Sequence, residues 1–396
     1  MQLSRRVRAM QASPVRKLVP YSIAAQKQGK KVYHLNIGQP DIKTPSEFMD
    51  AIRAFDEETI AYSVANGELS LIKAISKYYK RFGMDFAEDE ILITNGGSEA
   101  LIFAAIAVCN AGEEILVPEP FYTNYNGFTT AVDVAIKPIT TKAEEGFHLP
   151  SKEEILACVT DKTRAIMISN PGNPTGVVYS KEELETLAEV AKEKDLFIIS
   201  DEVYREFTYD GLTCTSFGNI KGVEDRVIIV DSVSKRYSAC GARIGSLCTK
   251  NKEFIKEVTK LCQTRLCVPT LEQIGAAALY EVSEDYLKEV NTEYQKRRDI
   301  TFEALSKMDN VVCEKPTGAF YVIAKLPIDD AEKFALWLLT DFEDNKETVM
   351  VSPAGDFYAT KGLGKDEIRI AYILEEKALK RALELLDKAI KAYNNK

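Results

Sequence analysis

The segment Val227-Ile228-Ile229-Val230-Asp231-Ser232-Val233-Ser234-Lys235-Arg236 passes from a short apolar run to a polar run that contains a lysine. A short run of apolar, mostly β-branched residues with polar residues on either side predicts a buried strand. Similar runs cover residues 91–94, 114–117, 165–169 and 196–200. Patterns typical of helices separate the runs, and this alternation predicts an α/β fold with a mostly parallel sheet flanked by helices.

The chain has 396 residues, which is long enough for two domains with separate cores. We predict a large domain at residues 44–285 and a smaller α+β domain, in which an N-terminal arm, residues 1–43, joins residues 286–396. A long amphipathic pattern that begins at Tyr286 favours this boundary. A strand pattern over residues 367–372 and a closing helix from about residue 375 to residue 393 complete the smaller domain.

Three local patterns predict further details. Thr44-Pro45-Ser46-Glu47 and Ser180-Lys181-Glu182-Glu183 have the spacing of capping boxes and predict the starts of two helices. The first helix is expected to run through Phe55. The basic cluster Lys296-Arg297-Arg298 is predicted to be a solvated helix face.

Composition excludes several classes of protein. The two histidines, His34 and His148, are too few for a His-rich zinc site or a Ser-His-Asp relay, and we expect no metal. The eight cysteines are scattered, which indicates a reducing, cytoplasmic location. A net charge of −9 argues against nucleic acid as a partner, and no apolar run approaches the ~20 residues of a membrane span.

Unusual residues follow four of the predicted strands, at the edge of a parallel sheet where ligands bind. Asn95-Gly96-Gly97-Ser98 opens a helix, whose free N–H groups suit a phosphate. Asn170-Pro171-Gly172-Asn173-Pro174-Thr175-Gly176 has two X-Pro bonds, which hint at cis peptides that hold Asn173 in one orientation. Asp201 ends the next run, with Tyr204 three residues later. Lys235 follows the last run.

A phosphate cradle, a strand-end carboxylate, a lysine and a further arginine, Arg243, are the parts that hold pyridoxal phosphate as a Schiff base. In their order and spacing these motifs resemble the class I, aspartate aminotransferase-like members of the pyridoxal-phosphate fold type I superfamily. The resemblance covers nearly the whole chain, from Asn36-Ile37-Gly38-Gln39-Pro40-Asp41 to Ile368-Arg369-Ile370. It implies pyridoxal 5'-phosphate as the cofactor and a homodimer as the active form.

The resemblance also implies roles for single residues. Lys235 forms the Schiff base and moves the substrate proton, Asp201 pairs with the ring nitrogen of the cofactor, and Tyr204 donates to its ring oxygen. The other cofactor contacts implied are those of Gly97, Ser98, Tyr122, Asn173, Ser232 and Arg243, with Tyr62 reaching the site of the other subunit. The implied substrate contacts are those of Gly38, Asn173 and Arg369, the last as a bidentate clamp on the α-carboxylate.

The resemblance therefore implies an aminotransferase that moves the amino group of an L-amino acid to a 2-oxo acid such as 2-oxoglutarate. Alanine, aromatic or branched-chain donors remain alternatives to an aspartate-like donor, and a pyridoxal-phosphate-dependent carbon-sulfur lyase would use the same lysine. A nicotinamide-dependent oxidoreductase is disfavoured because the glycine motif is not G-x-G-x-x-G. A regulatory relative would carry a DNA-binding domain, for which the chain has neither the length nor the basic surface.

The donor is the least determined part of this prediction. One branch of the family reads the distal carboxylate of its substrate with a lysine in the glycine motif, where this chain has Ser98. Arg265 is our candidate for a substitute cation, because its segment crosses toward the partner's active site in relatives. Arg16 in the N-terminal arm is the weaker candidate.

Overall fold

The computed structural model describes residues 1–396 and contains three β-sheets, of which the largest has seven strands in the order β2-β8-β7-β6-β5-β3-β4. The bounds of these strands are β2 Ile91–Asn95, β3 Glu114–Glu119, β4 Ala135–Thr140, β5 Thr163–Ser169, β6 Phe197–Asp201, β7 Val227–Ser232 and β8 Ile244–Cys248. Only β8 is antiparallel to its neighbours, β2 and β7. The predicted α/β fold with a mostly parallel sheet is confirmed, although β4 and β8 were not predicted.

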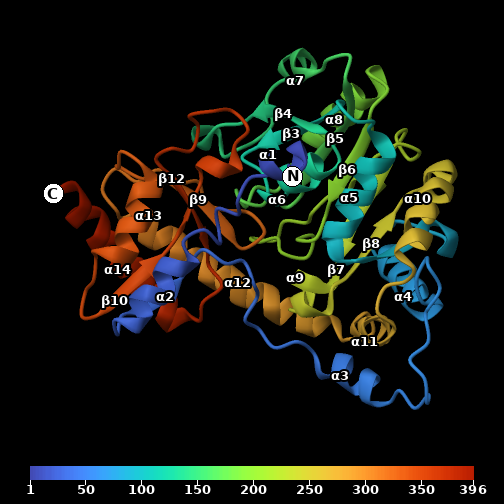
Figure 1. Cartoon of the computed structure of the whole chain (residues 1–396), viewed down its shortest axis with the longest axis horizontal. Helices are drawn as coiled ribbons and strands as arrows, with labels where there is room; N and C mark the ends of the chain where they lie inside the picture. Colours follow the sequence, from blue (N-terminus) through green and yellow to red (C-terminus); the bar gives the residue numbers. More distant parts are fainter.

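Helices cover both faces of the seven-stranded sheet because successive apolar residues of each strand point to opposite sides. On one face, strand residues such as Ile93 and Ile229 pack against helices α4 (Leu69–Lys80), α8 (Lys181–Glu193) and α11 (Thr270–Leu279). On the other face, residues such as Leu92 and Val230 pack against α5 (Gly96–Val108), α6 (Asn124–Ala131) and α10 (Lys252–Arg265). Figure 1 shows α5 lying along this second face.

The remaining strands form two small sheets with a core of their own. Strand β1 (Lys31–His34) pairs in parallel with β10 (Glu347–Met350), and the antiparallel order β11-β12-β9 joins Ser352–Pro353, Glu367–Ala371 and Tyr321–Lys325. The surrounding helices are α2 (Val19–Lys27), α12 (Glu284–Leu305), α13 (Ala331–Thr340) and α14 (Glu376–Asn394). In Figure 1 these C-terminal elements gather on the left beside α2, and α12 extends from them toward α9 and α11. No helix in the chain combines the length and apolar character needed to cross a membrane.

Two local predictions were wrong. The helix predicted at residues 44–55 is present as α3 (Ser46–Arg53), but Thr44 does not cap it, because its Oγ1 donates 2.8 Å to the carbonyl of Ser238. Within the basic cluster on α12, Arg297 and Arg298 are buried rather than solvated. Arg297 pairs with Asp41 and Glu293 and donates to the carbonyl of Ile373, so this helix face is an interface. The capping box at Ser180 is confirmed.

Candidate active site

A cavity of about 460 Å³ lies at the carboxyl ends of the parallel strands, between the seven-stranded sheet and β9 and β12. All the predicted site residues except one line it: Gly38, Gly97, Ser98, Tyr122, Asn173, Asp201, Tyr204, Ser232, Lys235, Arg243 and Arg369. The exception is Tyr62, whose side chain is 80% exposed and lies outside the cavity of its own chain. The sheet therefore brings together residues that are more than 300 positions apart in the sequence.

Lys235 extends into this cavity from α9 (Val233–Arg236), a single turn that follows β7 directly. Ser232 ends the strand and accepts 2.9 Å from the backbone N–H of Ser234, which starts the turn. The Nζ of Lys235 donates 2.8 Å to the carbonyl of Gly38 and lies 4.0 Å from the sulfur of Cys240. The amine is thus held at one end of the cavity by a contact that a reacting group can replace.

Asp201, the last residue of β6, is a buried carboxylate without a cationic partner. Its Oδ2 accepts 2.7 Å from the hydroxyl of Tyr125, and its Oδ1 accepts from the backbone N–H of Val203. Burial raises the pKa of Asp201 to about 6, because the charged form loses solvation that these two donors only partly replace. A buried carboxylate of this kind suits a cation, such as a protonated ring nitrogen, that enters the cavity.

Another part of the cavity, at the N-terminus of α5, is suited to a phosphate. Gly97 and Ser98 lie in the first turn of α5, where backbone N–H groups have no partner within the helix. Gly96 has a φ of +75°, and a Cβ on it would lie 2.3 Å from an amine of the Arg243 guanidinium. Glycine at this position therefore lets the arginine side chain reach the helix N-terminus. The two X-Pro bonds of the Asn170–Pro174 segment are both cis, as predicted.

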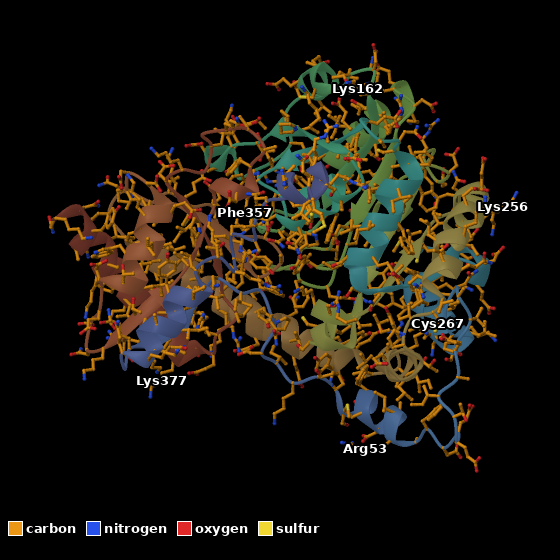
Figure 2. The ribbon with its side chains drawn as sticks, in the orientation of Figure 1. Arg53, Lys162, Lys256, Cys267, Phe357 and Lys377 are labelled. Carbon is orange, nitrogen blue, oxygen red and sulfur yellow. The ribbon has the colours of Figure 1, made fainter.

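Arg369 is a buried cation without an anionic partner. It lies in the middle of β12, where Nη2 donates 2.6 Å to the carbonyl of Asn36 and Nη1 donates 3.2 Å to Oδ1 of Asn173, while Nε has no partner. Burial lowers the pKa of its guanidinium. Its charged group lies 4.6 Å from the ring of Tyr321 and 5.0 Å from that of Phe357, which Figure 2 labels where the C-terminal segment meets the larger sheet. These contacts leave the cation available to a carboxylate.

The two candidates for a distal cation lie in different places. The Nη2 of Arg265 donates 3.1 Å to the carbonyl of Ile93, its Nε lies 3.4 Å from Glu99, and the side chain does not line the cavity of its own chain. Arg16 lines the cavity mouth and forms no ion pair. Within one chain, the geometry thus favours Arg16, the weaker candidate from the sequence, over Arg265 as the distal cation.

Two tyrosines in this region were missed by the sequence analysis. Tyr125 lies in the first turn of α6 and holds Asp201, and its ring centroid lies 5.5 Å from that of Tyr122, which precedes the helix. Tyr321 lines the cavity from β9 and lies diagonally across the strand pair from Arg369. The apolar run of β9 was a usable signal for a strand, but neither segment alone shows the antiparallel register that places Tyr321 beside Arg369.

Comparisons with known proteins give the family of this chain. Residues 30–386 match the family Aminotransferase class I and II. An aspartate aminotransferase of Pyrococcus horikoshii is 31% identical over 91% of this chain and 90% of its own length, and an aromatic-amino-acid aminotransferase of Thermococcus litoralis is 31% identical over 99% of both. The solved structure of an alanine aminotransferase from Pyrococcus furiosus has a TM-score of 0.90 at 30% identity, covering 99% of this chain and all of that one. This chain is therefore an aminotransferase of the class I and II family.

Proposed function

We propose that this aminotransferase moves the α-amino group of an aspartate-like L-amino acid to a 2-oxo acid such as 2-oxoglutarate, with pyridoxal 5'-phosphate bound as a Schiff base to Lys235. The observation that carries the proposal is one cavity that contains a lysine amine, a buried carboxylate without a cation and a buried guanidinium without an anion. The family match supports the reaction class. Substrates of this class are small molecules, which the cavity size suits.

Pyridoxal phosphate, when bound, supplies an aldehyde that condenses with amines and a ring that withdraws electrons from the substrate α-carbon. In this proposal Asp201 faces the ring nitrogen and Tyr204 donates to the ring oxygen beside Asn173. The phosphate is held by Gly97, Ser98, Ser232 and Arg243, and Tyr122 stacks on the ring. The amine of Lys235 would carry the proton of the substrate α-carbon, and Arg369 would orient the α-carboxylate beside Gly38.

A donor panel tests the proposal. Purified protein with pyridoxal phosphate and 2-oxoglutarate is assayed with aspartate, alanine, phenylalanine and leucine, and kcat/KM is expected to be highest for aspartate. A preference for alanine, phenylalanine or leucine would replace the aspartate assignment with one of the three alternative donor classes. Release of pyruvate and ammonia from a sulfur-containing amino acid without any acceptor would identify a carbon-sulfur lyase instead.

Arg16 supports the aspartate-like donor because its backbone is anchored beside the α-carboxylate site. The backbone carbonyl of Val15 accepts 3.0 Å from the side-chain amide of Asn36. The backbone carbonyl of Asn36 in turn accepts from Arg369. On the other side, Lys17 pairs with Glu332 and Asp356, so its charge is neutralised while that of Arg16 is not. An unpaired guanidinium at the cavity mouth suits a second carboxylate on the substrate.

We predict that Arg16→Gln lowers kcat/KM for aspartate and glutamate about tenfold and changes kcat/KM for alanine by less than twofold, because one charge-assisted hydrogen bond is lost. Steady-state kinetics with each donor measures the difference. Arg8→Gln is the matched control, since Arg8 belongs to the same arm but is exposed and outside the cavity. An equal loss for all donors would show that Arg16 does not read the distal group.

A homodimer is also part of the proposal. Ile60, Tyr62 and Val64 are 62%, 80% and 67% exposed on one short segment, and Leu266 is 54% exposed. Exposed apolar residues in one segment mark an interaction surface, and a second subunit there would place Tyr62 near the partner's cavity. Light scattering on the purified protein is expected to give twice the mass of 44.2 kDa.

A cytoplasmic location is also part of the proposal, and the scattered free cysteines favour it.

A further inference from the structure

Tyr321 connects three parts of the candidate active site that come from distant segments. Its ring, 2% exposed, packs 4.6 Å from the guanidinium of Arg369. Its hydroxyl lies 2.9 Å from the hydroxyl of Tyr204, across the boundary between β9 and the end of the seven-stranded sheet. The same hydroxyl lies 3.5 Å from the carbonyl of Gly38, which accepts 2.8 Å from Lys235.

The position of this hydroxyl is tightly constrained. A Cβ on residue 38 would lie 1.8 Å from the Tyr321 oxygen, so only glycine leaves room for it. The ring of Tyr321 is fixed by Phe320 and Tyr204, whose ring centroids lie 4.9 Å and 5.6 Å away. The close approach of Gly38 and the aromatic contacts hold the two phenol oxygens within hydrogen-bonding distance.

Counting hydrogens gives the direction of this bond. Each phenol has one hydrogen to donate and can also accept. Burial, together with the neighbouring Tyr321, raises the pKa of Tyr204, so this residue stays protonated and can act as a donor. If Tyr204 donates its one hydrogen to the ring oxygen of the cofactor, the hydrogen bond between the two phenols has Tyr321 as its donor. In this arrangement Tyr321 donates to the nearer oxygen, that of Tyr204 at 2.9 Å, and not to the carbonyl of Gly38 at 3.5 Å.

The geometry points to Tyr321 as a positioning residue: its hydroxyl orients the Tyr204 hydroxyl toward the cofactor ring oxygen and so links the strand pair that carries Arg369 to the cofactor. The inference rests on the proposed function. Beyond that function, the inference assigns a role to a residue that acts on the cofactor only through Tyr204. Two phenols in series polarise one another, which strengthens the bond that the second one donates.

The consequence is a shift in the proton affinity of the lysine–cofactor Schiff base. The ring oxygen stabilises the protonated Schiff base by accepting a hydrogen bond from it. A second hydrogen bond donated to that oxygen weakens this stabilisation, so with a weaker donor the Schiff base stays protonated up to a higher pH. The titratable and charged groups that face the two phenols are Tyr122, Asp201, Lys235 and Arg369. None of them is altered by removing one oxygen from Tyr321.

The test is the absorbance of the bound cofactor as a function of pH in Tyr321→Phe. The phenylalanine ring retains the packing against Arg369 and Phe320, and we expect the midpoint of the absorbance transition to rise by about 0.3 to 1 pH unit, the effect of one neutral hydrogen bond. We also expect the fold-decrease in kcat to be larger than the fold-change in KM. Tyr294→Phe is the matched control: this tyrosine is buried against Phe320 in the same cluster, its hydroxyl has no partner, and it lies outside the cavity.

A double substitution separates positioning from simple packing. Tyr204→Phe alone is expected to raise the midpoint further than Tyr321→Phe, and Tyr204→Phe/Tyr321→Phe is expected to match Tyr204→Phe, because Tyr321 then has nothing to orient. An unchanged midpoint in Tyr321→Phe, or a full additional shift in the double variant, would overturn the inference. If the wild-type protein shows no cofactor absorbance at all, it is the proposed function that fails.

Discussion

Lys235→Ala is expected to lose transamination by about 10⁴-fold or more, because in the proposed function this one side chain supplies both the covalent attachment and the proton transfer. No other amine can replace it, since Lys235 is the only lysine that lines the cavity. Its side chain donates to Gly38 and contacts Cys240 but forms no ion pair, so the fold should survive the change. The measurements are single-turnover kinetics, the cofactor absorbance and the circular dichroism spectrum, and only the last should be unchanged.

Lys43→Ala serves as the matched control, because Lys43 is exposed, forms no ion pair and lies outside the cavity. Borohydride reduction of the wild-type protein with bound pyridoxal phosphate, followed by peptide mass spectrometry, should place the cofactor mass on the peptide that contains Lys235. Turnover retained by Lys235→Ala, or a label on a different lysine, would contradict the assignment of the nucleophile.

The sequence predicted most of the cavity because of one property of parallel sheets. The carboxyl ends of parallel strands meet at one edge, so residues that follow separate apolar runs must converge. Asp201, Asn173 and Lys235 each follow such a run, and all of them line the cavity. Strand β8 was missed because Gly245 and Ser246 interrupt its apolar run, although all five of its residues are buried.

Pairwise contacts between distant elements could not be predicted in the same way. A local basic run such as Lys296-Arg297-Arg298 is typical of a solvated helix face, yet Arg298 is buried, where it donates to the carbonyl of Pro316 and pairs with Asp210. Tyr321 is another example, since its partners are Tyr204 and Gly38. Such partners depend on how the elements pack, and a single sequence does not contain that information.

Asp201→Asn is expected to lower kcat by about 10² to 10³, the usual effect of removing one preorganised electrostatic contact to the reacting group. The aspartate would stabilise a protonated ring nitrogen, and that proton is what makes the ring an effective electron acceptor. Asparagine can still accept from Tyr125 but carries no charge. Pre-steady-state absorbance with aspartate would measure the slower step, and an unchanged kcat would exclude Asp201 from this role.

The same substitution should have the opposite effect on the stability of the cofactor-free protein. The pKa of Asp201 is raised to about 6 by burial, against about 3.9 in an unfolded chain. The folded state therefore binds the proton more tightly, and stability is lost as pH rises from about 4 through about 6, by about 3 kcal/mol. Asp201→Asn removes this loss, so the Tm of the cofactor-free variant should exceed that of the wild type at pH 8 and match it near pH 4. Equal Tm values of the two cofactor-free proteins at pH 8 would show that the carboxylate is not destabilising. Adding pyridoxal phosphate should raise the Tm of the wild type more than the Tm of the variant, because the aspartate then gains its cation.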